Sequence, residues 1–265
     1  MLTGLIETAV LQASVMALIM AIAWLVQQRT GNSGWIDVSW VAAVGMTGVA
    51  SALFAATEAT APARQAAVVA LVAAWSLRLA WHIGSRALRT GDDPRYAELI
   101  RQWGSNAPKR LLFFAQSQAL AGIPLVLAIT LAAHRPAAGI DGQDLFGLMI
   151  MLTGVLLAAI ADRQMQLFSS HPGNRGMVCT TGIWAWSRHP NYFGEWLVWL
   201  GVAVVAFDFA WGWLALAAPA WMYWLLVHVS GVPPLEQHMI NTRGQVFRDY
   251  QRRTSVFFPM PPKSG

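Results

Sequence analysis

Long apolar runs, separated by short polar connections, dominate the pattern of the chain. A transmembrane helix needs roughly 20 mostly apolar residues, and seven runs approach this length. Apolar residues follow one another along each run, without the alternation that marks a transmembrane β-strand. The pattern therefore predicts an all-α, polytopic membrane protein with seven transmembrane helices. The predicted helices cover residues 5–26, 35–56, 66–84, 111–133, 145–161, 192–207 and 211–230.

The composition agrees with a membrane protein and excludes other classes. Charged residues make up 12% of the 265 residues, whereas an average soluble domain has about 25%. The 14 Trp and 11 Phe exclude a disordered chain, because disordered chains are polar and poor in aromatic residues. The single cysteine, Cys179, excludes an internal disulfide bond.

The basic residues predict how the helices are oriented. Cytoplasmic connections of membrane proteins carry an excess of Lys and Arg. If the N-terminus lies outside, 15 of the 18 basic residues fall on the cytoplasmic side, Arg64 and Arg135 fall outside, and Arg78 lies within a run. This split predicts an external N-terminus and a cytoplasmic C-terminus. It also accounts for most of these charges, so we expect no nucleic-acid partner.

Apart from Glu7, which lies near the outer end of the first predicted helix, five ionisable residues in or at the ends of the predicted helices lie near the predicted cytoplasmic end. They are Asp37, Arg78, His82, Asp162 and Glu195. Such residues destabilise a membrane helix and are usually functional. Their common depth indicates a polar site on the cytoplasmic side.

The spacing of these residues favours a site for a nucleotide cofactor. One helical stripe carries residues separated by four, four and three positions: Arg78, His82, Arg86 and Arg89. Asn191 and Glu195 are also four residues apart. Arginines bind phosphates, while carboxylates and amides bind ribose hydroxyls and amide groups. Internal ion pairs, such as Arg78 with Asp162, are the alternative.

Common nucleotide-binding and metal-binding motifs are missing from the sequence. It has no P-loop, no glycine-rich loop after a strand and no HExxH, and its six histidines lack metal-ligand spacing. We therefore expect no metal site. Any nucleotide must be held by the membrane helices and their inner connections.

Residues 182–195, GIWAWSRHPNYFGE, resemble the C-terminal signature of the steroid 5α-reductase family, especially its bacterial branch. Asn191, Tyr192, Gly194 and Glu195 match the Asn-aromatic-x-Gly-Glu core that the bacterial and animal enzymes share. The similarity covers most of the chain and is strongest from residue 162 onward. It includes DVSW at 37–40, Arg78, GDDPRY at 91–96, Asp162, NRG at 174–176, Glu236 and FRDYQRRTS at 247–255.

The resemblance implies a seven-helix membrane enzyme that binds NADPH from the cytosolic side and reduces a C=C bond conjugated to a ketone. The substrate would be a lipophilic, steroid-like ketone that enters from membrane lipid, and no obligatory protein partner is evident. Residues 1–265 would form a single domain, with substrate-side helices in 1–133 and a cofactor-binding part in 134–265. By position, the cofactor-binding residues would be Arg78, His82, Arg86, Arg89, Tyr96, Asp162, Asn174, Arg175, Arg188, His189, Asn191, Tyr192, Glu195, Tyr250 and Arg252.

Reduction of such a substrate also needs a group that donates to the ketone oxygen or the α-carbon. The animal enzymes of the family place a Gln-Glu pair on helix two and a Tyr on helix three around the ketone. Here the second helix offers Asp37, with Trp40 as part of the pocket wall, and Trp75 stands at the position of the Tyr. We expect Asp37, Trp40 and Gln116 to be catalytic, with Gln118 as a further candidate ketone donor.

Two other functions fit parts of the sequence. The Arg-His-Pro-x-Tyr element at 188–192 and a later Glu also resemble membrane methyltransferases of isoprenylcysteine or phospholipids, which bind S-adenosylmethionine. A transporter or scaffold is the third class, although the inverted repeats common in transporters are not found. Arg outnumbers Lys and Ala is abundant, which favours a bacterial inner membrane over the endoplasmic reticulum, with the active site open to the cytoplasm.

Overall fold

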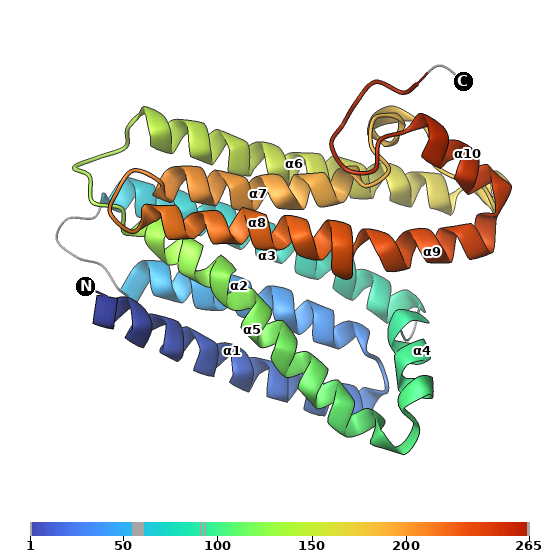
Figure 1. Cartoon of the computed structure of the whole chain (residues 1–265), viewed down its shortest axis with the longest axis horizontal. Helices are drawn as coiled ribbons and strands as arrows, with labels where there is room; N and C mark the ends of the chain where they lie inside the picture. Colours follow the sequence, from blue (N-terminus) through green and yellow to red (C-terminus); the bar gives the residue numbers. More distant parts are fainter. Residues whose placement is uncertain (1, 55–60, 91, 93, 264–265) are drawn as a thin grey trace. The chain divides into compact units, whose positions relative to one another are not determined.

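The computed structural model describes residues 2–54, 61–90, 92 and 94–263. Over these ranges the chain is helical and contains no strand; its single β-bridge joins Ser187 and Ser255. A helix satisfies its own backbone hydrogen bonds, as the interior of a membrane requires. The α-helices are α1 (Leu2–Thr30), α2 (Gly34–Phe54), α3 (Pro62–Thr90), α4 (Pro94–Trp103), α5 (Ala107–Ala133), α6 (Gly142–Ser170), α7 (Pro190–Ala206), α8 (Ala217–Trp224), α9 (Val232–Arg243) and α10 (Gln245–Arg253) (Figure 1).

Six segments of the described chain are long and apolar enough to cross a membrane, so the prediction of an all-helical, polytopic membrane protein is confirmed. The run predicted at 192–207 forms α7, which has 17 residues and is not among the six. Its crossing of the membrane and the orientation of the termini stay predictions. The six segments are Ile6–Thr30, Gly34–Phe54, Pro62–Arg89, Tyr96–Ala133, Gly142–Ser170 and Gly212–Arg243.

Several helices extend past the ends of the apolar runs. α3 continues through Arg86 and Arg89 to Thr90, and α6 continues past residue 161 to Ser170. These extensions contain Arg, Gln, Met and Leu, which are good helix formers. Residues 94–103, which were expected to be part of a polar connection, form the separate helix α4.

The chain divides into two compact units. The first unit comprises Met1–Leu148 and Val202–Ala218, and the second comprises Met149–Gly201 and Pro219–Gly265. The long helix α6 contributes to both units, because the division falls after Leu148. The predicted boundary between a substrate-side part and a cofactor-binding part lies earlier, at the C-terminal end of α5.

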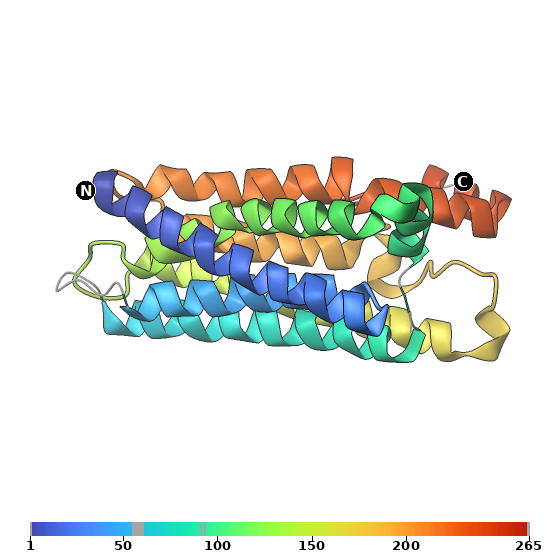
Figure 2. The ribbon, with the colours of Figure 1, turned by 90° about the horizontal axis from the view of Figure 1, so that it is seen from below.

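Small residues allow α2 to approach two neighbouring helices of the first unit closely. α2 and α3 lie side by side (Figure 2), and a Cβ on Gly45 of α2 would lie only 2.2 Å from Oγ of Ser76 on α3. A Cβ on Gly48 would lie 2.5 Å from Cδ1 of Ile129 on α5. Such contacts favour small residues, because close packing rather than a hydrophobic force holds helices together in lipid.

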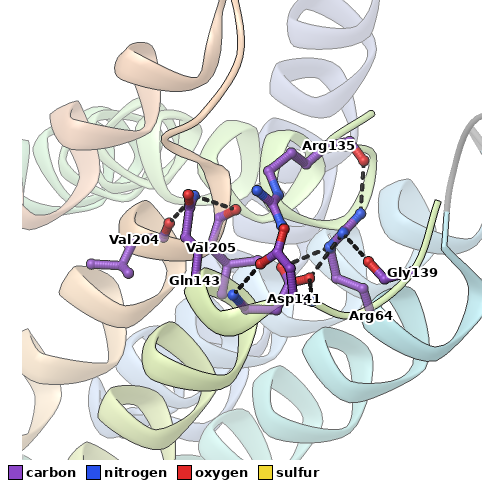
Figure 3. Close-up of polar contacts among 8 residues, drawn as sticks. Arg64, Arg135, Gly139, Asp141, Gln143, Val204 and Val205 are labelled. Carbon is purple, nitrogen blue, oxygen red and sulfur yellow. Dashed lines mark hydrogen bonds and ion pairs between the residues drawn. The ribbon is translucent and has the colours of Figure 1, made fainter. Parts of the chain in front are cut away.

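An ion-pair network joins the start of α3 to the start of α6 in the first unit (Figure 3). Arg64 and Asp144 are fully buried, and Nε and Nη2 of Arg64 donate to the two oxygens of Asp144 at 2.7 and 2.8 Å. The carbonyl groups of Arg135 and Gly139 each accept a hydrogen bond from Arg64 at 2.7 Å. Arg135 pairs with Asp141 at 2.5 Å and with Asp144 at 2.9 Å. We call Arg64, Arg135, Asp141 and Asp144 the Arg64 network.

Asp141 and Asp144 also stabilise the first turn of α6, which begins at Gly142. Oδ1 of Asp141 accepts from the backbone N–H of Asp144 at 2.9 Å, and Oδ2 of Asp144 accepts from the backbone N–H of Asp141 at 3.0 Å. This reciprocal pair is a capping box, which satisfies backbone donors that the first turn of a helix leaves free. The N–H of Asp144, followed by the Arg135 guanidinium, holds the pKa of Asp141 below its usual value.

Two glycines bring α6 and α7 together in the second unit. A Cβ on Gly154 would lie 2.6 Å from the carbonyl oxygen of Gly194, and a Cβ on Gly194 would lie 2.7 Å from the backbone nitrogen of Ala158. Backbone atoms stand in the way at both positions, so no larger residue fits without moving a helix. This contact fixes the first turns of α7 against α6.

The C-terminal segment folds back on the connection that precedes α7. α8 leads through a π-helical turn, Leu225–Val229, into α9 and α10. The backbone N–H of Arg188 then donates to the carbonyl of Ser255 at 2.8 Å, and the N–H of Met260 donates to the carbonyl of Trp186 at 2.9 Å. The tail therefore ties down the segment that carries the Arg-His-Pro element.

Candidate functional site

Three helices of the first unit bring polar side chains together near the start of α2. The Tyr96 hydroxyl donates to Oδ1 of Asp37 at 2.7 Å, and Nε2 of Gln118 lies 3.3 Å from both that oxygen and the Tyr96 oxygen. Tyr96 is 4% exposed, while Asp37 and Gln118 are half-buried. Oε1 of Gln118 is buried and accepts no hydrogen bond from any described residue. We call Asp37, Tyr96 and Gln118 the Asp37 cluster.

The position of each member of the Asp37 cluster has a local reason. Asp37 lies in the first turn of α2, where the helix dipole favours a carboxylate. Tyr96 lies on the buried side of the amphipathic helix α4, whose ionisable side chains at 98 and 101 are exposed. Gln118 follows Phe114 by one turn of α5, and the Phe114 ring meets the Tyr96 ring edge-on, with centroids 5.7 Å apart.

The other two predicted catalytic residues have different surroundings. Nε1 of Trp40 donates to the backbone carbonyl of Gln118 at 2.8 Å. Trp40 therefore contacts the backbone of a member of the Asp37 cluster. Nε2 of Gln116 donates to the carbonyl of Ala17 on α1 at 3.2 Å. The structure therefore brings Gln118, and not Gln116, to Asp37. Residues two apart on a helix point about 200° apart, so only one of the two glutamines can face α2.

The predicted cationic stripe lies on one continuous helix. α3 includes Arg78, His82, Arg86 and Arg89, which the sequence spacing expects on a single face. Arg78 and His82 are half-buried, whereas Arg86 and Arg89 are exposed. Nε of Arg89 donates to the carbonyl of Ser85 at 2.9 Å. The stripe thus passes from half-buried to solvent-exposed positions along the last three turns of α3.

The start of α7 carries polar residues of the second unit. Pro190 occupies the first helical position, where its missing N–H removes no helical hydrogen bond. Nδ2 of Asn191 donates to Oδ1 of Asp162 on α6 at 3.3 Å. Oδ1 of Asn191 is buried and has no partner among the described residues. Glu195, one turn later, is 7% exposed.

A second polar network of this unit centres on Glu236 of α9. Nε of Arg188 donates to Oε1 of Glu236 at 2.7 Å, and Nε2 of His189 lies 3.0 Å from the same oxygen. Nε2 of Gln251 donates to Oε2 at 2.7 Å. The ring of Tyr192 stacks on His189, with centroids 5.3 Å apart. We call Arg188, His189, Glu236 and Gln251 the Glu236 network.

Tyr250 holds the connection that precedes α7. Its hydroxyl donates to the carbonyl of Trp184 at 2.5 Å, and the side chain packs in a small core with Val178 and Phe247. Burial raises the pKa of the Tyr250 hydroxyl well above its usual value. Tyr250 therefore stays neutral and acts as a hydrogen-bond donor at any physiological pH.

The remaining predicted cofactor residues lie on the surface of the second unit. Nδ2 of Asn174 donates to the carbonyl of Phe168 at 2.8 Å and so closes the turn after α6. Arg175 and Arg252 are exposed. Arg252 pairs with Asp249, which lies three residues earlier on α10. Because Arg175 is exposed, a ligand can reach its side chain.

Comparison with known proteins identifies a family for the chain. A family described as proteins of unknown function, DUF1295, matches residues 23–254. The chain belongs to the DUF1295 family. This family is related to steroid 5α-reductase-like membrane proteins. No curated protein and no solved structure gives a significant match.

Sequence reasoning missed two contacts of this DUF1295 protein. The sequence indicates Glu236 only as part of a resemblance, although its carboxylate contacts both Arg188 and His189, which lie more than forty residues earlier in the chain. Tyr96 was expected at the cofactor because of its motif, whereas its hydroxyl binds Asp37. Among the described residues, no group of three or more His, Cys, Asp or Glu side chains could hold a metal ion.

Proposed function

We propose that this DUF1295 protein is a membrane-embedded, NADPH-dependent reductase of a C=C bond conjugated to a ketone. The substrate is lipophilic, such as a 3-oxo-4-ene steroid. The observation that carries the proposal is the hydrogen bond between Tyr96 and Asp37, which joins a phenol hydroxyl on the amphipathic helix α4 to a carboxyl group in the first turn of the apolar helix α2. The relation of the family to steroid 5α-reductase-like membrane proteins supports it.

Reduction of an enone needs a hydride at the β-carbon, a donor to the ketone oxygen and a proton at the α-carbon. NADPH, when bound, would supply the hydride. The Tyr96–Asp37 pair would hydrogen-bond to the ketone oxygen and hold the proton that the α-carbon receives. Apolar surroundings strengthen such an interaction, because the electrostatic attraction is screened less than in water.

Groups of the second unit fit a dinucleotide. The free Oδ1 of Asn191 can accept from an amide or a ribose hydroxyl, and the carboxylates of Asp162 and Glu195 can accept from hydroxyls. The exposed guanidinium of Arg175 suits a phosphate. The NADPH contacts of the α3 stripe stay a prediction.

The remaining predicted cofactor residues fit a supporting role. Arg188 donates through all three guanidinium nitrogens to Glu236 and to the carbonyls of Gln251 and Thr254. With those donors engaged, Arg188 and the Glu236 network would act by holding the start of α7, where Asn191 lies.

We also propose an external N-terminus, a cytoplasmic C-terminus and a seventh membrane helix at α7. The membrane is a bacterial inner membrane, and the active site opens to the cytoplasm. The Arg64 network supports this orientation. Arg64 and Arg135 are the two basic residues expected outside, and both are paired with acids, so they add no net positive charge there.

A methyltransferase that uses S-adenosylmethionine is the second candidate. One observation favours it: the Arg-His-Pro element and a later Glu, which resemble the methyltransferases, are joined by contacts of Arg188 and His189 with Glu236. The Asp37 cluster has no evident task in methyl transfer, and for that reason we favour the reductase.

Ligand-dependent thermal stability separates the two candidates. A ligand that binds only the folded protein stabilises it by about 2.7 kcal/mol at a concentration 100 times its dissociation constant. We expect NADPH to raise the unfolding temperature of the detergent-solubilised protein, and S-adenosylmethionine to leave it unchanged. Stabilisation by S-adenosylmethionine alone would replace the reductase with the methyltransferase.

A further inference from the structure

We propose that Gln118 is a positioning residue of this reductase: its amide holds the Tyr96 hydroxyl against Asp37 and stabilises the Tyr96 oxygen when that oxygen gives up its proton. The inference rests on the proposed function. The sequence indicates Gln118 only as a candidate donor to the ketone, whereas the role proposed here acts through Tyr96.

The amide of Gln118 is shared between the other two members of the Asp37 cluster. Its Nε2 lies 3.3 Å from Oδ1 of Asp37 and 3.3 Å from the Tyr96 oxygen. The two oxygens lie only 2.7 Å apart, so the amide can donate to both through one shared N–H. Asp37 comes from α2 and Tyr96 from α4, and Gln118 links both of them to α5.

Two further contacts hold α5 against α2 and Tyr96. Its backbone carbonyl accepts from Nε1 of Trp40, which lies one turn after Asp37 on α2. Phe114, one turn before Gln118, contacts the ring of Tyr96 edge-on. α5 therefore holds Tyr96 at its ring and at its hydroxyl, which leaves the phenol little freedom to turn away from Asp37.

Stability alone does not explain an amide at this position. Oε1 of Gln118 is buried without a partner among the described residues, and such an atom destabilises a fold. Leucine has a similar size and would leave no polar atom unsatisfied. An arrangement that sacrifices stability for two donated hydrogen bonds is expected at a functional site.

The hydrogen bonds of Gln118 would stabilise Tyr96 during proton transfer to the substrate. As the α-carbon of the substrate enolate forms its C–H bond, the O–H bond of Tyr96 breaks and its electron pair stays on the phenol oxygen. A hydrogen bond to an ionised acceptor is stronger than one to a neutral acceptor, so Gln118 favours the state after proton transfer. Water then returns a proton to Tyr96, and the hydride comes from NADPH.

The test is a double-mutant cycle in lipid nanodiscs with Gln118→Leu, Tyr96→Phe and both together. We expect Gln118→Leu alone to lower kcat about fivefold, with KM within about twofold and the unfolding temperature within about 4 °C. In the Tyr96→Phe background the same change should alter kcat less than about twofold, because its partner oxygen is gone. Gln118→Met serves if Gln118→Leu does not accumulate.

A matched control makes the same chemical change elsewhere. Gln102 of α4 is exposed, and its amide donates to Glu98 at 2.7 Å, so Gln102→Leu should leave kcat unchanged. The solvent deuterium isotope effect on kcat should rise in Gln118→Leu, because proton transfer slows relative to hydride transfer. A purely structural residue would not change it.

The outcomes separate this proposal from the function on which it rests. Equal effects of Gln118→Leu in the wild-type and Tyr96→Phe backgrounds, or an unchanged kcat, would overturn the positioning role and leave the reductase intact. A wild-type protein that reduces no lipophilic enone with NADPH would overturn both.

Discussion

The first unit contains two buried polar groups at opposite ends of α2 and α3, and they are built differently. In the Arg64 network, all three guanidinium nitrogens of Arg64 donate, and both oxygens of Asp144 accept, over distances of 2.7 to 3.0 Å. In the Asp37 cluster, the contacts of Gln118 are 3.3 Å long and its Oε1 has no partner among the described residues. Nε of Arg135 is the comparable exception in the Arg64 network.

We interpret this difference as one between a structural group and the proposed functional group. A buried ion pair stabilises a protein only while both partners are present, because either one alone is an uncompensated charge. The Arg64 network meets this condition and joins α3 to α6. In the Asp37 cluster, Oε1 of Gln118 has no partner among the described residues, which is expected of a functional site more than of a structural one. We therefore expect mutations in the two groups to affect different properties.

Removing the acid of the Arg64 network should have the largest effect on stability. Asp144→Ala leaves the fully buried Arg64 without its carboxylate, which lowers the free energy of unfolding by about 3–5 kcal/mol. Thermal unfolding in detergent measures the change. Asp141→Ala is the control, because this side chain is 46% exposed and its loss should matter much less. Equal losses from both variants would contradict the distinction between the two acids.

The corresponding change in the Asp37 cluster should affect turnover and leave stability nearly unchanged. We expect Asp37→Asn to lower the rate of enone reduction about 100-fold or more, equivalent to about 2.7 kcal/mol of transition-state stabilisation. NADPH binding should persist. Asp208→Asn, at an exposed position outside both groups, is the matched control. A wild-type rate in Asp37→Asn would remove this carboxylate from the mechanism.

The phenol should contribute somewhat less than the carboxylate. Tyr96→Phe keeps the ring that packs on Phe114 and deletes only the hydroxyl, so we expect about a tenfold loss of kcat and a stability change of about 1 kcal/mol. Tyr223→Phe in the second unit makes the same change far from Asp37 in sequence and should leave kcat unaltered. If Tyr96→Phe loses stability but no activity, Tyr96 is a structural residue like Tyr250.

The smallest effect concerns the pH dependence of the Arg64 network. The folded protein lowers the pKa of Asp141, so ionised Asp141 stabilises the fold above its unfolded pKa of about 3.9. This contribution is lost as the pH falls through the folded value. The difference in unfolding temperature between wild type and Asp141→Asn should therefore be constant from pH 7 to 5 and shrink below about pH 4. A difference that grows on acidification would contradict the assigned interactions.

Much of the fold could be predicted, because the signals are local. Seven apolar runs predicted an all-helical membrane protein, and the runs form helices at nearly all the expected positions. Helix ends were harder, since polar residues continue α3 and α6 past the apolar sequence. The short helix α4 was missed because its ten residues carry too few apolar positions to stand out.

The sequence predicted individual residues of the candidate site, and it did not predict which of them contact one another. Asp37 and Trp40 stood out, as an acid in an apolar run and as part of a motif. Choosing Gln118 over Gln116 requires the rotation of α5 relative to α2, which the sequence does not contain. Arg64 and Arg135 were expected to be external loop charges, and their acids, Asp141 and Asp144, lie in a stretch that was interpreted only as a connection and a helix start.

Transfer of deuterium from labelled NADPH to a substrate tests the central claim most directly. The wild-type protein in lipid nanodiscs is incubated with NADPH that carries deuterium at C4 of the nicotinamide and with a set of lipophilic enones. We expect a saturated ketone with one deuterium at the β-carbon and a solvent-derived hydrogen at the α-carbon, and almost no product with Asp37→Asn. Absence of labelled product from every enone, with methyl transfer from S-adenosylmethionine instead, would contradict it.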